Sequence, residues 1–305
     1  MASTAIGIDI GGTHLRAARV SDGGEILDRV AERTVRDPEA VVARILDLIR
    51  RLDRPSVAAI GIGVPGRVDA GRGTVLSGGY VDLSQVRLAE RVAAAAGRPV
   101  AIDNDGTMAL VAEIAVGAAQ GHESVALLTI GTGIGGAIAE GGRILRGRRA
   151  AGQLGHVTID AGGERCACGR LGCVETVSSG TALGRHVAAA GLPAGTSADR
   201  LFALEAAGDP AARRALLAWA TPLRAAIESI VAVADPDLVL LGGGLGAAAQ
   251  RALALVPAAA DWFCCPVEAA ALGDDAGVIG AALCGLMDRV CDLHPVRAPS
   301  PREVA

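Results

Sequence analysis

The sequence predicts an α/β fold in which two α/β lobes repeat one pattern. Two segments, 5–20 and 124–140, each consist of a strand, a glycine-rich turn and a second strand. Between such segments apolar residues recur with helical spacing, which is typical of α/β domains. Hydrophobic residues make up 51% of the 305 residues but aromatic residues only 2%, so Ala, Val, Leu and Ile must build the core. A chain of this length can fill two lobes.

The first lobe is expected over residues 1–118. After the strand–turn–strand segment at 5–20, a helix is predicted over 38–52, because Asp37 is a favoured N-cap and Pro38 suits the first helical position. One face of this helix is apolar and consists of Val41, Ile45, Leu48 and Leu52. The other predicted elements are a buried strand at 57–63, a helix at 88–96 that Gly97 ends, a strand at 99–102 and a helix at 106–119.

The second lobe is expected over residues 119–275. Strands are predicted at 124–130 and 135–140, followed by mostly helical sequence at 176–234 and a strand at 237–241. A helix at 276–292 is expected to return to the first lobe. Residues 295–305 include three prolines and are expected to form a disordered tail.

The charged residues exclude several classes of protein. The net charge of −4 argues against a nucleic-acid-binding surface. Lysine is absent, which excludes a Walker A loop, a pyridoxal Schiff base and the strand lysine of protein kinases. No stretch resembles a signal peptide or is apolar and uninterrupted enough to span a bilayer. We therefore expect a cytoplasmic protein that binds neither nucleic acid nor membranes.

Four residues with metal-binding side chains lie close together in the sequence: His156, Cys166, Cys168 and Cys173. Three thiolates and one imidazole fill a tetrahedral Zn²⁺ shell with no open position, which is typical of a structural site. The alternative is three unrelated buried cysteines, but the Cys-x-Cys-x4-Cys spacing with a nearby His favours a ligand set. A site of reduced thiols also fits the cytoplasm.

Each glycine turn is a candidate phosphate loop. Asp9 ends the first strand, and the N–H groups of Gly11-Gly12-Thr13 are free to bind phosphate, with Mg²⁺ held at Asp9 through water. The alternative is an ordinary hairpin turn. The second turn, which begins Gly131-Thr132-Gly133, formally matches the dinucleotide fingerprint G-x-G-x-x-G, but that fingerprint opens a helix and here a strand follows. We therefore predict a second phosphate loop, with the Thr132 hydroxyl facing the phosphates.

Two further polar or glycine-rich segments follow predicted strands. Gly242–Gly244 would let a base or ribose approach the backbone, although a plain strand-to-helix turn explains these glycines equally well. Asp103-Asn104-Asp105 precedes a helix, and such residues are favoured N-caps. Three in a row are more than a cap needs. A carboxylate here could take a proton from a hydroxyl that attacks a phosphoryl group.

Taken in order, these motifs resemble the ROK family (repressors, open reading frames and kinases), whose enzymes are sugar kinases. The resemblance extends from Ile6 to about Leu286. It rests on Asp9–Thr13, Gly61–Gly66, Asn104-Asp105, Gly131–Gly136, Gly155-His156, Cys166–Glu175, Gly242–Gly244 and Leu272–Gly277. It implies a homo-oligomer, either dimer or tetramer, of chains with the two-lobed actin-like (ribonuclease H-like) ATPase fold, in which duplicated α/β lobes surround a cleft.

The resemblance also implies roles for individual residues. Asp105 matches the catalytic base, and the expected sugar ligands are Asn104, Asp105, Gln153, His156 and Glu175, with His156 also a zinc ligand. The expected ATP-binding residues are Asp9, Gly11, Gly12, Thr13, Gly131, Thr132, Gly133, Gly243 and Gly244. The implied cofactors are ATP, Mg²⁺ and a structural Zn²⁺.

Three positions depart from the family pattern, and all three are expected near the sugar. Gln153 replaces the usual Glu, Thr107 replaces the usual Asn, and Ser77–Val81 replaces the usual Pro-Asn-Leu segment. The phosphate-binding motifs are unaltered. The sequence thus keeps the kinase residues and changes some that would select the substrate.

We therefore predict an ATP- and Mg²⁺-dependent, glucokinase-like sugar kinase in which Asp105 deprotonates the 6-hydroxyl of glucose or a related hexose. An alternative substrate is an N-acylhexosamine, either N-acetylmannosamine or N-acetylglucosamine. An alternative of another class is a sugar-responsive transcription repressor. Those family members carry a DNA-binding segment before the first glycine turn, whereas Asp9 lies near the start of this sequence and the net charge is acidic. A non-catalytic sugar-binding protein would not need Asp105 or both phosphate loops.

Overall fold

The computed structural model describes residues 3–259 and 261–286. It divides into two compact units. Unit 1 comprises the chain up to Glu123, then Ile138–Ala151, and the chain from Asp274 onward, whereas unit 2 comprises Ser124–Ala137 and Gly152–Gly273. The sequence-based boundary lay at 118/119, without the 138–151 segment in the first lobe. The predicted helical residues 287–292 and the predicted tail at 295–305 lie outside the described residues.

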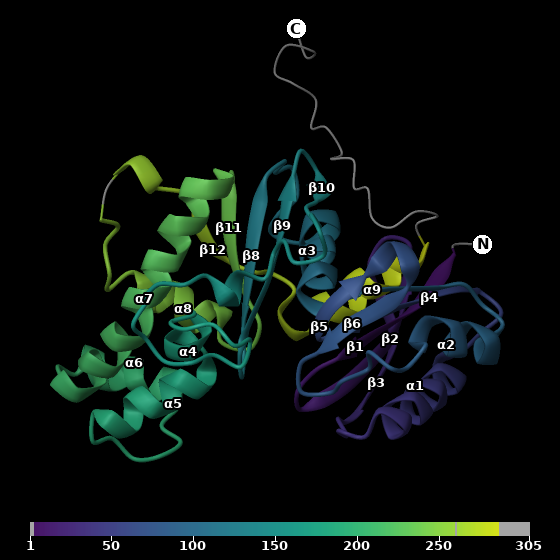
Figure 1. Cartoon of the computed structure of the whole chain (residues 1–305), viewed down its shortest axis with the longest axis horizontal. Coiled ribbons are helices and arrows are strands. Elements are labelled where there is room, and N and C mark those ends of the chain that lie inside the picture. The colour runs from purple at the N-terminus through teal and green to yellow at the C-terminus, as the bar shows by residue number, and fades with distance from the viewer. Residues whose placement is uncertain (1–2, 260, 287–305) are drawn as a thin grey trace, which may run out of the picture. The chain divides into compact units, whose positions relative to one another are not determined.

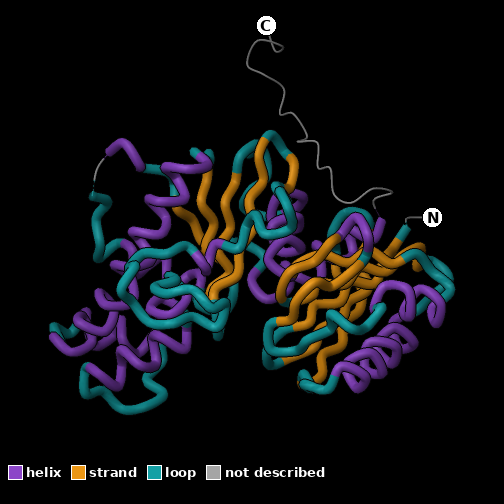
Figure 2. The backbone as a smooth tube through the Cα atoms, viewed as in Figure 1, coloured by secondary structure: helices purple, strands orange, loops and turns teal. Residues whose placement is uncertain are grey.

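Unit 1 contains a five-stranded mixed sheet in the order β3-β2-β1-β4-β7 (Figures 1 and 2). Strand β1 pairs antiparallel with β2 and parallel with β4, and β4 pairs parallel with β7. The strands are β1 (Thr4–Ile10), β2 (His14–Ser21), β3 (Ile26–Arg33), β4 (Val57–Val64) and β7 (Val100–Asn104). A separate two-stranded sheet pairs β5 (Gly66–Asp69) with β6 (Thr74–Gly78).

Helices cover the sheet of unit 1. α1 (Pro38–Leu52) and α2 (Leu88–Ala96) bury their apolar residues in one large core with β1 and β4. α9 (Ala276–Leu286) packs on β1 and β4 and also contacts α3 (Asp105–Val116). The approach of α9 is close because β4 offers Gly61, where a Cβ atom would lie 1.7 Å from the carbonyl oxygen of Ala281.

Helix α1 confirms the prediction made from its capping residues. The side chain of Asp37 accepts a hydrogen bond from the N–H of Ala40 at 2.8 Å, and the four predicted apolar positions are all buried. Strand β3 was not predicted, because it alternates half-buried and exposed residues and carries four charged side chains. Such a pattern suits the edge of a sheet but gives a weak strand signal.

The second sheet repeats the strand order of the first. Its order is β10-β9-β8-β11-β12, with β8, β11 and β12 parallel and β9 and β10 antiparallel. The strands are β8 (Val125–Ile130), β9 (Ile134–Glu140), β10 (Arg143–Ile144), β11 (Leu238–Gly242) and β12 (Val267–Ala269). The glycine turn joins the first two strands of each sheet, so the duplication predicted from the two turns is confirmed.

The helices of unit 2 lie mostly between β10 and β11 in the sequence. They are α4 (Glu175–Ser178), α5 (Gly180–Ala189), α6 (Ala198–Ala206), α7 (Pro210–Ala234) and α8 (Gly246–Leu253). The described chain also forms 3-10 turns in both units: η1 (Ala70–Arg72), η2 (Leu154–His156), η3 (Asp261–Phe263) and η4 (Gly273–Asp275). By length and composition α7 could cross a membrane, contrary to the expectation from the sequence. It packs on α5, α6 and α8 and buries Trp219 completely, as a core helix does.

Candidate active site and metal centre

One carboxylate oxygen of Asp105 accepts hydrogen bonds from the protein, and the other accepts none in the described residues. β7 ends at Asn104, whose side-chain oxygen caps α3 by accepting hydrogen bonds from the N–H groups of Gly106 and Thr107. The Asn104 amide donates to the Gly66 carbonyl and to Asp105 Oδ1, each at 2.8 Å. Oδ1 also accepts from the N–H of Gly106 at 2.9 Å. In the described part of the chain no donor is bonded to Oδ2, which can therefore accept a proton.

The N-capping interpretation is thus correct for Asn104 and leaves Asp105 available for another role. Asp103, the third polar residue, is buried and bonded to the guanidinium of Arg146 at 2.7 Å. Thr107, at the position where the family usually has Asn, is buried in α3. Asn104, predicted to bind a sugar hydroxyl, already bonds four groups of unit 1 in this conformation.

Asp9 lies close to Asp105, although the two are far apart in the sequence. Both residues contact Gly63 on β4. A Cβ atom at Gly63 would lie 3.5 Å from the Asp105 Cα and 3.6 Å from Asp9 Oδ1. Burial raises the pKa of Asp105 to about 6. Burial and the charge of Asp105 raise the pKa of Asp9 to about 7, while the Arg16 guanidinium opposes this shift. Two carboxylates with raised pKa values suit proton acceptance and cation binding.

The first glycine turn presents free backbone N–H groups. The N–H of Gly11 bonds to the carbonyl of His14 at 2.9 Å, and Thr34 anchors the carbonyls of Gly11 and Thr13. Gly12 and Thr13 are exposed, and within residues 3–259 and 261–286 their N–H groups have no bonded acceptor. Such a turn can bind an anion, which is the role predicted for it from the sequence.

Tyr80 is a residue of this site that the sequence reasoning did not single out. Its ring lies against Gly12, with Cε1 3.4 Å from where a Cβ atom would be, and its hydroxyl donates to the carbonyl of Ile10. Burial and the charges of Asp105 and Asp9 raise the Tyr80 pKa, so the phenol stays neutral. Tyr80 belongs to the atypical segment 77–81 and is the single tyrosine of the sequence, a signal that could have found it.

The second glycine turn lies beside the triple glycine within unit 2. Thr132 is exposed, and the N–H of Gly131 bonds to the carbonyl of Gly133 at 2.9 Å. The N–H of Leu245, directly after Gly242–Gly244, bonds to the carbonyl of Ile130 at 3.0 Å. The structure thus brings the predicted ATP-binding residues of unit 2 together at the ends of β8 and β11.

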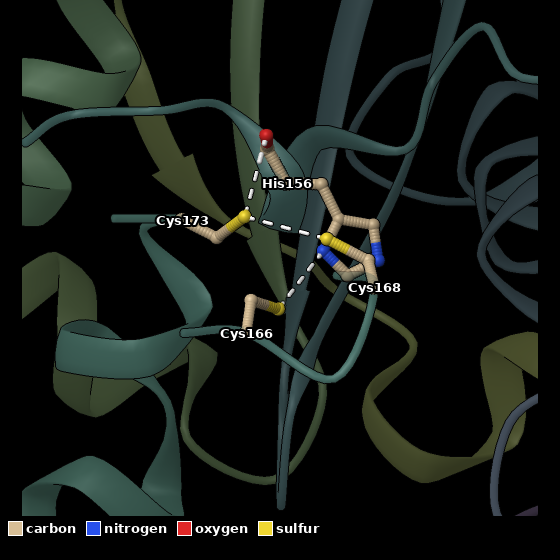
Figure 3. Close-up of side chains that lie close together, drawn as sticks. All are labelled: His156, Cys166, Cys168 and Cys173. Atoms are coloured by element: carbon tan, nitrogen blue, oxygen red, sulfur yellow. Dashed lines mark hydrogen bonds between the residues drawn. The ribbon is translucent and has the colours of Figure 1, made fainter. Parts of the chain in front are cut away.

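The four predicted metal ligands converge in unit 2 (Figure 3). Their ligand atoms all lie within 4.8 Å of one another. The distance from Cys166 Sγ to His156 Nδ1 is 3.6 Å, as is that from Cys168 Sγ to Cys173 Sγ. Ligands about 2.3 Å from a tetrahedral Zn²⁺ are separated by about 3.8 Å, so the cluster fits this ion. The alternative of three unrelated cysteines is wrong.

The two remaining predicted sugar ligands differ in their surroundings. Gln153 precedes η2 and is half-buried, and in the described chain its side chain forms no hydrogen bond. Glu175 begins α4 and is already engaged. Its Oε2 accepts from the N–H of Ile134 at 2.9 Å, and its Oε1 lies 3.6 Å from Cys166 Sγ.

Comparisons with known proteins identify the family of this chain. The model of the ROK family matches residues 5–286. A glucokinase of Thermotoga maritima is 32% identical over 302 residues, covering 91% of this chain and 95% of the relative. An N-acetylmannosamine kinase of Yersinia pseudotuberculosis is 31% identical, covering 91% and 97%. A ROK glucokinase of Streptomyces griseus, solved with glucose and AMPPNP, superposes with a TM-score of 0.78 at 31% identity, covering 93% and 99%. The chain has the fold of these actin-like ATPases, and it belongs to the ROK family.

Proposed function

We propose that this chain is an ATP-dependent sugar kinase that phosphorylates the 6-hydroxyl of glucose or a closely related hexose. The observation that carries the proposal is the arrangement of Asp105, whose Oδ1 is fixed by two hydrogen bonds while Oδ2 is free. The glucokinase relatives support a hexose as the acceptor, and the AMPPNP-bound neighbour supports ATP as the donor.

In the proposed reaction Asp105 acts as the general base. Its Oδ2 takes the proton of the sugar hydroxyl while the hydroxyl oxygen attacks the γ-phosphorus of ATP. The bond between this phosphorus and the β–γ bridging oxygen breaks, and ADP leaves with the electron pair. A pKa of about 6 leaves Asp105 ionised at neutral pH and still basic enough to accept a proton.

The two glycine turns are our candidates for binding the phosphates. The free N–H groups of Gly12 and Thr13, and those of Thr132 and Gly133, can donate to phosphate oxygens. The hydroxyls of Thr13 and Thr132 are exposed and can add further hydrogen bonds. Gly243 and Gly244 would leave room for the ribose or base to contact the backbone.

Asp9 is our candidate for holding Mg²⁺, through water. Asp105 and Asp274 both raise the pKa of Asp9 by their charges, so a cation would relieve a repulsion that Arg16 offsets only in part. Oxygen ligands of this kind suit Mg²⁺. When bound with ATP, this ion supplies charge neutralisation at the phosphates.

We propose that His156, Cys166, Cys168 and Cys173 hold a structural Zn²⁺, because four protein ligands leave no position for a substrate. The metal would fix the segment that contains Glu175 and would orient His156. Reduced thiolates at such a site fit a cytoplasmic enzyme. By family resemblance we expect a dimer or tetramer.

A second substrate class is favoured by Gln153. An amide both donates and accepts hydrogen bonds without charge, and this side chain is free of protein partners in the described residues. It can therefore donate to an acetamido carbonyl, which a Glu carboxylate would repel. The N-acetylmannosamine kinase relative is consistent with this alternative.

A panel of sugars, with ATP consumption measured for each at saturating Mg²⁺, tests the proposal. We expect turnover with glucose or a related hexose and a 6-phosphate product. Greater kcat/KM for N-acetylmannosamine would select the second substrate class. Binding of sugar without any phosphorylation would contradict the kinase proposal and favour a sugar-binding or regulatory protein.

A further inference from the structure

The second glycine turn is held by the residues that follow the last metal ligand in the sequence. The N–H of Gly180 donates to the carbonyl of Gly131 at 2.8 Å, and the hydroxyl of Thr181 donates to the carbonyl of Thr132 at 2.8 Å. Both donors lie at the start of α5, which Ser179 caps through its side chain. Two successive carbonyls of the turn are therefore fixed from one side.

Fixing these carbonyls also fixes the N–H groups proposed to bind phosphate. In a planar trans peptide the C=O and the N–H of the next residue point in opposite directions. The Gly131 carbonyl points toward α5, so the N–H of Thr132 points away from this helix, and the Thr132 carbonyl orients the N–H of Gly133 in the same way. The start of α5 thus presets the phosphate-binding face of the turn.

The metal cluster contacts the far end of the same turn at Ile134. Glu175 Oε2 accepts from the N–H of Ile134 at 2.9 Å, while Oε1 of the same carboxylate lies 3.6 Å from Cys166 Sγ. Gly155, next to His156, lies so close that a Cβ atom would be 1.9 Å from the Ile134 carbonyl oxygen. A Cβ atom at Gly133 would be 2.5 Å from Glu175 Oε2. The two segments that adjoin the metal cluster, at Gly155 and at Glu175, therefore both contact this end of the turn.

We infer that the metal cluster and the second glycine turn form one rigid structural unit, so that metal occupancy sets the affinity for the nucleotide phosphates. Glu175, Gly180 and Thr181 are its positioning residues. The inference rests on the proposed kinase function and extends the role of the metal from the sugar side to the nucleotide side. It follows because the cluster and the turn share rigid contacts, and a fixed turn binds an anion without reordering.

Thr181 offers a test that does not depend on metal removal. Binding of Mg-AMPPNP without sugar is measured by calorimetry for the parent, Thr181→Val and Thr181→Ser. Losing one hydrogen bond should weaken binding about 3- to 10-fold for Thr181→Val, with the KM for sugar unchanged, and Thr181→Ser should restore the parent value. Thr196→Val is the matched control, because the hydroxyl of the half-buried Thr196 also donates to a backbone carbonyl, that of Pro193, at 2.7 Å.

The link to the metal is tested in the parent protein by its reciprocal effect. If zinc strengthens nucleotide binding, the nucleotide must strengthen zinc binding by the same factor. Zinc retention against a zinc-selective chelator should therefore increase by at least about 3-fold in saturating Mg-AMPPNP.

The outcomes separate the inference from the proposed function. An unchanged Kd for Mg-AMPPNP in Thr181→Val would overturn the role of Thr181 in positioning the second glycine turn. An equal loss of Mg-AMPPNP affinity in Thr196→Val would do the same. Zinc retention that does not respond to Mg-AMPPNP overturns the coupling. A parent protein that binds no Mg-AMPPNP at all overturns the proposed kinase function together with the inference.

Discussion

We expect Asp105→Asn to abolish most of the activity while making the folded protein more stable at neutral pH. Both hydrogen bonds to this side chain end on Oδ1, and the amide oxygen of Asn can take the position of Oδ1 and accept the same two bonds. The substitution therefore alters only the free Oδ2. It removes the proton acceptor and the buried charge and leaves the anchoring contacts intact.

The size of the stability change follows from the pKa of Asp105. Burial raises it from 3.8 to about 6, and each pKa unit corresponds to about 1.4 kcal/mol. The folded parent binds the proton more tightly than the unfolded chain, so the parent loses stability as the pH rises from about 4 to about 6. The full effect is on the order of 3 kcal/mol above pH 6.

Urea unfolding at pH 4 and pH 8 measures the stability change, and a coupled ATP assay measures turnover. We expect Asp105→Asn to gain about 1–3 kcal/mol relative to the parent at pH 8 and much less at pH 4. Turnover should fall about 10²- to 10⁴-fold. Asp105→Ala is the comparison, because it loses the same proton acceptor but leaves the Gly106 N–H and the Asn104 amide without their acceptor. Turnover within a few-fold of the parent would refute the assignment of the base, and equal gains at both pH values would refute the burial argument.

Four further predictions concern the pH profile, the metal and the substrate. The kcat/KM for sugar should fall as the pH drops below about 6, because protonated Asp105 cannot accept a proton; a flat profile down to pH 5 would count against it. Cys168→Ser should lose about one zinc per chain, activity and melting temperature together, whereas metal-free protein of full activity would contradict a structural role. Gln153→Glu should raise kcat/KM for glucose relative to N-acetylmannosamine, and an unchanged ratio would make Gln153 a passive replacement. Tyr80→Phe should raise the KM for ATP about 2- to 10-fold, since it frees the Ile10 carbonyl beside the first turn; an unchanged KM would show that the hydroxyl does not support that turn.

Short-range signals in the sequence were enough to predict much of the fold and the metal centre. Helix α1 has the predicted bounds, because Asp37, Pro38 and a regular apolar face act within a few residues of one another. The two glycine turns predicted the duplicated sheets. The metal ligands lie within one segment, 156–173, so their spacing already limited the geometry.

The sequence did not predict several strands whose residue patterns are weak. β3, β5, β6 and the short strands β10 and β12 carry weak patterns of their own and exist because a neighbouring strand offers hydrogen bonds. Likewise α7 looks long and apolar enough for a membrane, and only its packing against α5, α6 and α8 gives that apolar face a partner.

By itself the sequence determined which side chains can carry out the chemistry: the polar run at 103–105, the glycine turns and the thiol–imidazole set. Only the tertiary structure decided how those side chains are engaged. It placed Asp9 beside Asp105 across Gly63 and assigned the capping role to Asn104, which leaves Oδ2 of Asp105 free. It also laid Tyr80 on the first glycine turn. The physical reason is that burial, charge repulsion and hydrogen-bond pairing depend on neighbours that packing brings together from distant parts of the sequence.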